Sequence, residues 1–380
     1  MAIDNKNKVL NVPHLRFPEF SGEWVTCTLG DITSSFNLRN KDEVPYPMYS
    51  VTNNRGFIPQ SEQFEDREMI GEDAKAYKII HKDDFAYNPA RINVGSIAKY
   101  NGVHPCMISS LYVCFKAGLQ VDKDWLMQLL KTSKMNFYYN INGEGGVRVY
   151  LFYPNFARIR TSYPATLTEQ KKIAHFLSLL DERIATQNKI IDKLQSLIKG
   201  INCKIFASIQ GNEYRLGDIA TITNGNSNVQ DASVEYRIGL YPFFDRSEDV
   251  KYLPTFLFDK ESIIYPGEGT EFMPRYYKGK FALHQRCYAI CDFNEVVNPQ
   301  FLYFFLKTQN SYFIKNAVGS TVPSLRLDTF QKLKVVIPSK ETQYSISSLL
   351  SVLEQKIDVE NNSMKMLLCQ KRYLLRQMFI

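Results

Sequence analysis

The sequence predicts an α+β protein in which two repeated mixed α/β blocks are joined by two long helices that form an antiparallel coiled coil with pseudo-twofold symmetry. Three observations predict this fold class. The chain of 380 residues repeats itself once, each half ends in a heptad pattern of apolar residues, and 44% of its residues are hydrophobic against 22% charged. That composition is typical of a folded globular protein and excludes disordered, collagen-like and disulfide-scaffold classes.

The repeat is visible as short matches that keep their order in the two halves. Leu29-Gly30-Asp31-Ile32 recurs as Leu216-Gly217-Asp218-Ile219, and the stretch 82–87 recurs as 260–265. The offset between matches drifts by a few residues, as loop insertions and deletions produce after a duplication. The stretches between the matches align poorly, and we expect them to be surface loops on a shared scaffold.

The repeat gives the order block, helix, block, helix, with Pro164 and Pro338 at the end of each block. Within each block, β-branched and aromatic runs predict strands, and the Leu-, Phe- and Tyr-rich stretches 125–140 and 299–315 predict helices. The predicted boundaries are an N-terminal arm at 1–19, a first block at 20–165, a central helix at 166–210, a second block at 211–338 and a C-terminal helix at 339–380.

Heptad spacing predicts the two long helices, because their apolar residues recur three and four positions apart. The predicted seam of the first helix consists of Leu177, Leu180, Ile184, Gln187, Ile191 and Leu194. The predicted seam of the second consists of Leu350, Leu353, Ile357, Glu360, Met364 and Leu367. One buried polar residue can fix the register of a coiled coil, and Gln187 and Glu360 are equivalent candidates. In the alternative, each stripe packs only on its own block, but the two stripes match position by position.

Chain connectivity predicts how the two helices pair. The first helix is followed at once by the second block, and the second helix leaves that block at Pro338. The second helix therefore starts where the first one ends and runs back antiparallel to it. We expect the blocks at opposite ends of the pair, with a helical spacer of roughly 42 Å at about 1.5 Å per residue.

The distribution of charge predicts a polyanionic partner more strongly than the net charge of +7. The stretches 85–121 and 272–291 contain no Asp or Glu, and both combine basic with aromatic residues. Lys and Arg neutralise DNA phosphates, and Arg can also read guanine. The alternative is that both stretches are core segments that happen to lack acids. The predicted DNA-binding residues are Arg91, Lys99, Lys116, Arg148, Arg275, Lys278, Lys280 and Arg286.

Two equivalent loops are rich in glycine or small residues, at 142–148 and 317–322. Such loops can bring backbone N–H groups close to a phosphate. They are more often simple turns, and both interpretations stay open.

Motifs for catalysis and metal binding are weak, so we expect no catalytic residue and no metal site. Asn88-Pro89-Ala90-Arg91 lacks the second proline and the aromatic of amino-methyltransferases, and Asp73-Ala74-Lys75 is an isolated fragment of a nuclease pattern. No Walker A motif and no glycine-rich S-adenosylmethionine motif is found. The His and Cys residues near 104–114 and 284–291 differ in spacing between the repeats, so buried thiols are a better interpretation than zinc ligands.

The compartment follows from the N-terminal residues and the cysteines. Residues 1–8 are polar, and no run of about 18 apolar residues exists, so neither a signal peptide nor a membrane span is predicted. The seven cysteines are scattered along the chain. We therefore expect a cytoplasmic protein with reduced thiols.

Several motifs together resemble the specificity subunit of a type I restriction-modification system. The opening Val12–Phe20 leads through Gly22-Glu23-Trp24 to Leu29-Gly30-Asp31, and the first block exits through Pro164 and Glu169–Ile173. The second half carries Gly319–Pro323 and Ile337-Pro338. The resemblance covers essentially the whole chain.

This resemblance implies two target recognition domains, each of which binds one half of a bipartite DNA target, with helices that set the gap between the halves. It implies a role in bacterial defence without catalysis or a bound cofactor in this chain. Two methyltransferase subunits and restriction/translocase subunits would be partners and would use S-adenosylmethionine, ATP and Mg. The alternative, a self-contained DNA-modifying enzyme such as a methyltransferase or nuclease, is disfavoured by the missing motifs.

The second half departs from the family pattern at three places. It has Glu341-Thr342 before Gln343, Glu354 in place of the Asp181 of the first half, and Lys371 in the seam. We expect these departures to weaken the helix pair or a methyltransferase contact on that side.

Overall fold

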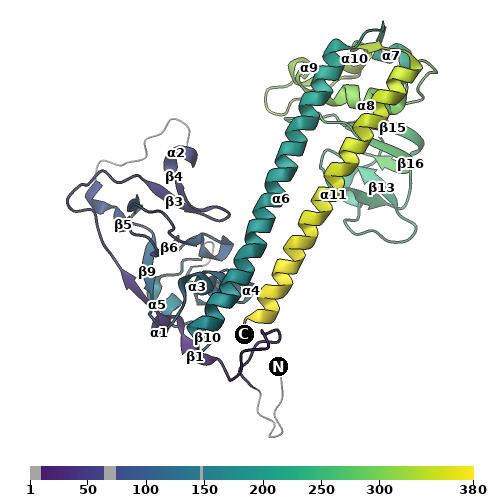
Figure 1. Ribbon diagram of the computed structural model, residues 1–380. Coiled ribbons are helices and arrows are strands. Elements are labelled where there is room, and N and C mark those ends of the chain that lie inside the picture. The colour runs from purple at the N-terminus through teal and green to yellow at the C-terminus, as the bar shows by residue number, and fades with distance from the viewer. Residues whose placement is uncertain (1–9, 64–73, 146–148) are drawn as a thin grey trace. The chain divides into compact units, whose positions relative to one another are not determined.

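The computed structural model describes residues 10–63, 74–145 and 149–380 (Figure 1). The chain divides into two compact units, which we call unit 1 (residues 1–186 and 364–380) and unit 2 (residues 187–363). Each unit therefore contains one block together with one part of each long helix. No helix among the described residues is long and apolar enough to cross a membrane.

Unit 1 is built from short antiparallel strands and short helices. Its largest sheet has four strands in the order β2-β9-β6-β7. The pairs β1-β10, β3-β4 and β5-β8 form three separate two-stranded sheets. The strands are β1 Val25–Thr28, β2 Thr33–Phe36, β3 Tyr49–Thr52, β4 Gly56–Pro59, β5 Lys78–Ile80, β6 Phe85–Tyr87, β7 Ile97–Lys99, β8 Cys106–Ile108, β9 Val113–Ala117 and β10 Arg160–Tyr163. The helices are α1 Leu29–Ile32, α2 Gln60–Gln63, α3 Lys123–Leu130, α4 Ser133–Asn142 and α5 Tyr153–Ala157, with 3-10 turns η1 Ala74–Ala76 and η2 Ile92–Val94.

Unit 2 has a larger sheet of six strands, in the order β12-β17-β15-β16-β13-β14, and a separate pair β11-β18. The strands are β11 Asn212–Arg215, β12 Thr221–Asn224, β13 Tyr241–Phe244, β14 Lys251–Leu253, β15 Phe258–Pro266, β16 Arg275–Leu283, β17 Cys287–Cys291 and β18 Lys334–Ile337. The helices are α7 Leu216–Ile219, α8 Pro299–Lys307, α9 Asn310–Asn316 and α10 Leu327–Gln331, with the 3-10 turn η3 Val229–Asp231.

The two blocks repeat the same order of elements. In both, a first strand pairs with the last one (β1-β10 and β11-β18), and the repeated Leu-Gly-Asp-Ile segment forms a short helix (α1 and α7). A Cβ at Gly30 would lie 3.1 Å from Ala157 of α5, so glycine allows this close approach. The arrangements β2-β9-β6 and β12-β17-β15 also correspond. The predicted fold class, with repeated mixed blocks and two long helices, is confirmed.

The long helices are α6 (Leu167–Ser208) and α11 (Lys340–Met378). They lie side by side (Figure 1) and make contacts within each unit. In unit 1, Lys371 of α11 is paired with Asp181 of α6. In unit 2, the side chain of Gln187 donates a 2.5 Å hydrogen bond to Glu360, which occupies the equivalent position of the other repeat.

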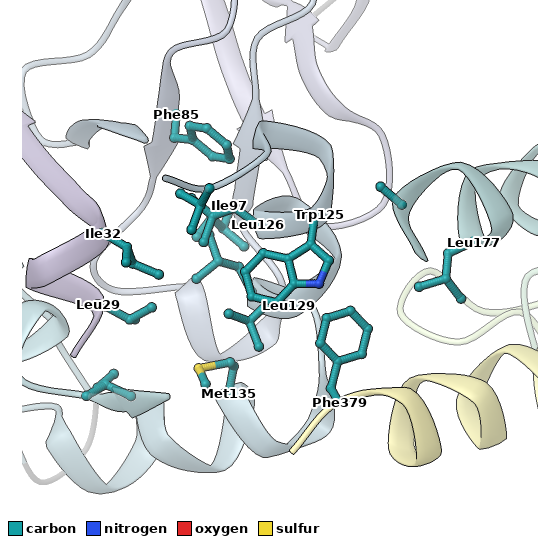
Figure 2. Close-up of a cluster of buried hydrophobic side chains, with 14 of the residues drawn as sticks. Leu29, Ile32, Phe85, Ile97, Trp125, Leu126, Leu129, Met135, Leu177 and Phe379 are labelled. Atoms are coloured by element: carbon teal, nitrogen blue, oxygen red, sulfur yellow. The ribbon is translucent and has the colours of Figure 1, made fainter. Parts of the chain in front are cut away.

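The core of unit 1 joins its block to the helix ends. Trp125 of α3 and Phe379, which follows α11, stack with ring centroids 5.8 Å apart, and Leu177 of α6 belongs to the same buried cluster (Figure 2). The N-terminal arm is attached to this core, because Arg16 forms a bidentate ion pair, with two hydrogen bonds, to the buried Glu169. Bidentate pairs of this kind combine charge with fixed geometry.

Candidate nucleic-acid interface

The basic residues predicted for DNA binding in the first block have different surroundings. Lys99 is mostly buried and lies 2.6 Å from Asp124, so its charge is already compensated. Lys116 lies 3.7 Å from the buried Asp84. Arg91 is exposed, and its side chain forms no ion pair with any described residue. Of these three, Arg91 is the one without a compensating acid among the described residues.

In the second block, Arg275 holds a loop in place. Its guanidinium donates to the backbone carbonyls of Asp245, at 3.0 Å, and of Ser247, and it lies 5.6 Å from the ring centre of Phe244. Burial lowers the pKa of Arg275. These contacts make Arg275 a positioning residue for the loop that follows β13.

The other basic residues of the second block lie at its surface. Lys278 lies 3.9 Å from Glu261, and Arg286 lies 2.9 Å from Glu268. Lys280 lies 4.8 Å from the ring centre of Phe256 and has no ion pair within the described part of the chain. Surface ion pairs of this kind are weak, so Lys278 and Arg286 can exchange their acids for phosphate.

The two acid-free stretches of sequence are therefore not acid-free in space. Asp84 and Asp124 flank the first stretch, and Glu261 and Glu268 precede the second, and all four approach its cations. Much of both stretches also lies in core strands, since β6 and β17 are buried throughout. The DNA-binding residues remain predictions, and the geometry favours Arg91 and Lys280 among them.

A polar cavity of about 640 Å³ opens in unit 1 where three segments meet. The turn after β3 supplies Asn53 and Asn54, the loop after β6 supplies Asn88 and Arg91, and the segment before β9 supplies Tyr112. Asn and Arg are the side chains that pair with two atoms of a base edge, Asn with adenine and Arg with guanine. We call this the unit 1 cavity.

One side chain of the unit 1 cavity has an unused hydrogen-bonding group. Gln60 donates from Nε2 to Ser50 at 3.1 Å, while its buried Oε1 has no partner among the described residues. Buried polar atoms are nearly always paired. An N–H donor of a ligand in the cavity would satisfy this oxygen.

A second polar cavity, of about 480 Å³, opens in unit 2, and we call it the unit 2 cavity. Its lining includes Arg246 after β13, Glu268 after β15, and His284, Gln285 and Arg286 before β17. Arg246 is exposed and has no ion pair with a described residue. The cavity therefore combines cationic donors with two carboxylates, those of Glu268 and the buried Asp245.

His284 is held as a neutral donor in the unit 2 cavity. Its Nδ1 accepts a 3.2 Å hydrogen bond from the backbone N–H of Arg286, so the ring proton resides on Nε2. Burial lowers the pKa of His284 below its ordinary value of 6.5. The ring is thus uncharged at neutral pH and presents an N–H to the cavity.

The two cavities occupy equivalent places in the repeated fold. Each is lined by the turn that follows the first strand of a hairpin (β3 or β13), by the loop after a central strand (β6 or β15), and by the segment before the next central strand (β9 or β17). The lining residues differ, with amides prominent in unit 1 and cationic and imidazole groups in unit 2. The two cavities therefore share a position in the repeat but differ in chemistry.

Backbone pairing holds the described parts of the two small-residue loops. In the loop 142–148, Glu144 bridges to Tyr150, while Arg148 lies outside the described residues. In the loop 317–322, Val318 bridges to Ser324, and Gly319 has φ +103°, a conformation that favours glycine. The second loop fits the simple-turn interpretation, and phosphate contact remains a prediction for both loops.

The four cysteines of the His- and Cys-containing stretches are buried in the core. Burial raises the pKa of Cys106 and Cys114 to about 12, and that of Cys287 and Cys291 to about 11. All seven cysteines are free. Among the described residues, no group of three or more His, Cys, Asp or Glu is placed to hold a metal ion.

Each long helix is bonded to its block by a glutamine at the equivalent position of the repeat. In unit 1, Gln170 accepts from the backbone N–H of Asp122, the N-cap of α3, and donates to the carbonyls of Gln120 and Pro164. In unit 2, Gln343 makes the corresponding bonds to Asn298, Val296 and Pro338. Both glutamines are at most 1% exposed. We call these two residues the helix clamps.

The carboxylates that differ between the repeats make a second equivalent contact. Asp181 of α6 accepts from Gln128 of α3 at 3.1 Å, and Glu354 of α11 accepts from Tyr303 of α8 at 3.2 Å and from Lys307. The change from Asp to Glu therefore retains a helix-to-block contact.

The predicted seam positions of both helices face other parts of their own unit. All twelve side chains are buried or half-buried. They are Leu177, Leu180, Ile184, Gln187, Ile191, Leu194, Leu350, Leu353, Ile357, Glu360, Met364 and Leu367. Lys356 and Gln187 lower the pKa of Glu360, so this seam position is a carboxylate. Lys371 is half-buried and its charge is compensated by Asp181.

Sequence reasoning missed several residues of the cavities. Asn53 and Arg246 lie in loops that align poorly between the repeats. Asn88 was noted only as part of an incomplete methyltransferase motif, and Gln285 only as a member of the acid-free stretch 272–291. For two of them a positional signal was available, because Asn53 follows the strand-like run 46–51 and Gln285 precedes the strand-like run 286–291. His284 was considered only as a metal ligand.

Comparison with known proteins shows what this chain is similar to. Residues 210–367 match the family model "Type I restriction modification DNA specificity domain". The type I restriction enzyme EcoDI specificity subunit of Escherichia coli is 29% identical over 143 residues, which cover 38% of this chain and 31% of that protein. The match thus spans about a third of the length of this curated relative. The resemblance found in the sequence is confirmed.

Two solved structures share the fold over nearly the whole chain. The S subunit of a type I restriction-modification system from M. genitalium has a TM-score of 0.63 at 16% identity and covers 97% of this chain and 99% of that one. A structure described as the basis of complex assembly and conformational transition of the type I R-M system has a TM-score of 0.58 at 12% identity, with 93% and 96% covered. At these identities the likeness shows the fold.

Proposed function

Because this chain carries a type I restriction modification DNA specificity domain, we propose that it is the sequence-specific DNA-binding specificity subunit of a type I restriction-modification complex. It recognises a bipartite DNA target, and each unit reads one half. The observation that carries the proposal is the pair of polar cavities at equivalent places in the two units.

The chemistry of the cavities suits base edges in the major groove. In unit 1, Asn53, Asn54 and Asn88 can each donate and accept, as adenine requires, and Arg91 can pair with guanine. In unit 2, Arg246 and the Nε2–H of His284 are donors for guanine, and Glu268 is an acceptor for the amino group of cytosine. Phosphate contacts alone would carry no sequence information.

The partners we propose are two methyltransferase subunits and restriction/translocase subunits. Apolar side chains are exposed at repeat-equivalent positions near the start of each long helix: Phe176 and Leu179 on α6 correspond to Leu349 and Val352 on α11. Paired exposed apolar patches favour protein contacts, and two equivalent patches fit two copies of one partner. This chain has no catalytic role in the proposal, which assigns S-adenosylmethionine, ATP and Mg to the partners. The free thiols agree with a cytoplasmic complex.

Sequencing of DNA methylation in the host, with the gene present and deleted, tests this proposal. With the gene present, we expect adenine methylation at a motif of two short specific halves separated by a gap of fixed length. Deletion should abolish methylation at that motif, and the coding sequence restored in trans should recover it. A motif that persists in the deletion strain, or one without a gap, would contradict the proposal.

A further inference from the structure

Unit 1 has another cavity, and its lining is more basic than that of the unit 1 cavity. It has a volume of about 580 Å³ and is bordered by η2, the start of α4 and the last turns of α11. Four cationic side chains contribute to its lining, and no Asp or Glu is found among the described residues that line it. The four are Lys131, Lys371, Arg372 and Arg376, and we call the cavity the basic groove.

Most of this charge is uncompensated within the protein. Lys371 pairs with Asp181, while Lys131, Arg372 and Arg376 form no ion pair within the described ranges. Arg372 makes a weak 3.2 Å contact with the sulfur of Cys369. Burial lowers the pKa of Lys131 and the charge of Lys371 lowers it further, while the charge of Asp181 opposes both effects. Like charges held close together repel one another, and an anion in the groove would relieve that repulsion.

The start of α4 adds neutral donors to the groove. α4 begins at Ser133, which lines the groove, and its N-cap Thr132 accepts from the N–H of Met135. The other N–H groups of the first turn have no partner inside the helix, and the helix dipole favours negative charge at this end. The helix end and the cations therefore attract the same kind of ligand.

The groove adjoins the unit 1 cavity. Asn53 lines both, and Arg91 of the cavity directly precedes Ile92 of the groove. A duplex whose base edges enter the cavity would bring its sugar-phosphate strand to the adjoining cations. Phosphates along one strand recur about every 3.4 Å of helix axis, so the groove is large enough for more than one.

We infer that the basic groove binds the phosphate backbone of the same DNA whose bases enter the unit 1 cavity. The C-terminal helix thereby supplies DNA contacts to the first recognition block. This inference rests on the proposed function, because it requires that unit 1 reads DNA.

Unit 2 has fewer cations at the equivalent positions and provides a matched control. The repeat places Ile198, Lys199 and Cys203 where the groove has Lys371, Arg372 and Arg376. Lys307, the equivalent of Lys131, is already paired with Glu354. We therefore expect the extra phosphate contacts on the unit 1 half of the target alone.

Salt dependence of DNA binding by the full-length chain in complex with its methyltransferase partner tests the inference. The probes are an unmethylated duplex that carries the motif identified by methylation sequencing and a duplex of the same length without that motif. The double variant Arg372→Ala/Arg376→Ala should lower the slope of log affinity against log salt by about two, because each neutralised phosphate contributes roughly 0.9 to that slope. Between about 50 and 200 mM salt, its affinity should then fall about tenfold less than that of the wild type.

The controls separate phosphate binding from folding and from base recognition. Arg372→Lys/Arg376→Lys should retain the wild-type slope, and so should Lys199→Ala on α6. The loss of affinity in the alanine variant should be the same on both duplexes, because phosphates carry no sequence information. Its melting temperature should match that of the lysine variant.

Two results would overturn the inference and leave the proposed function intact. One is an alanine variant with the wild-type slope on DNA that the wild type binds specifically. The other is an unchanged slope together with loss of the methyltransferase subunit, which would assign the groove to an acidic protein surface. A wild-type complex without preference for the motif would instead contradict the proposed function itself.

Discussion

At the scale of single residues, the same side-chain type serves different purposes at different places. Arg275 uses its guanidinium to hold backbone carbonyls of the loop after β13, whereas the neighbouring Arg246 is exposed in the unit 2 cavity. The loop has a second anchor in Asp245, which is 4% exposed and accepts from Lys251 at 2.7 Å. The loop that presents Arg246 is therefore held from both sides.

The charge of Asp245 makes this loop sensitive to acid. Burial raises the pKa of the Asp245 carboxyl, but hydrogen bonds from Lys251 and Ser247 outweigh burial and hold it below the ordinary 3.8. The ionised carboxylate thus stabilises the folded state above the ordinary pKa, and this contribution is lost as the pH falls through the lowered one.

The variant Asp245→Asn should therefore be less stable than the wild type by about 1–3 kcal/mol near neutral pH, because Lys251 loses its charged partner. It should also lose less stability than the wild type between about pH 5 and pH 2, because the titrating group is gone. Urea denaturation across this range measures both effects. Asp249→Asn, an exposed acid of the same loop, is the control, and equal pH dependence in Asp245→Asn and wild type would contradict this account.

At the scale of elements, the helix clamps connect the repeat in the sequence to the repeat in the structure. Gln170 and Gln343 were visible as repeated positions, but their partners were not, because these are backbone groups of segments about 50 residues earlier in the chain. The clamp bonds the start of each long helix to the N-cap of a short helix of its block. These buried bonds orient the start of α6 on the first block and the start of α11 on the second block.

Replacement of a clamp by Leu should destabilise the unit to which it belongs. Gln170→Leu leaves the N–H of Asp122 and two carbonyls without their partner, at a cost of about 1–3 kcal/mol for each buried group left unpaired. Gln343→Leu should have a similar effect on unit 2, and Gln195→Leu at an exposed position of α6 should have little effect. Hydrogen exchange of the two units measures the change unit by unit. Equal protection in the three variants would show that the clamp bonds do not stabilise their units.

At the scale of the whole molecule, the repeat and the heptads were sufficient to predict the fold class, because both are periodic and depend on local sequence. The recognition surface was predicted less well. Lys99 and Lys116 lie in acid-free sequence but meet Asp124 and Asp84 in space. Arg372 lies in a helix for which no DNA contact was predicted. Long-range pairing decides which charges remain free, and local composition does not report it.

The central claim is that each unit reads one half of the DNA target through its own cavity. Selection of bound sites from a random duplex library, by complexes with altered cavities, tests this claim most directly. The unit 2 variant is Arg246→Ala/His284→Ala, and the unit 1 variant is Asn53→Ala/Asn88→Ala. Removal of a side chain that reads a base should reduce discrimination at that base pair by about 1–3 kcal/mol.

The account predicts that each variant relaxes the sequence of one half of the motif, a different half in each case. The other half and the gap between the halves should stay as in the wild type. A variant that changes both halves, or two variants that relax the same half, would contradict the account.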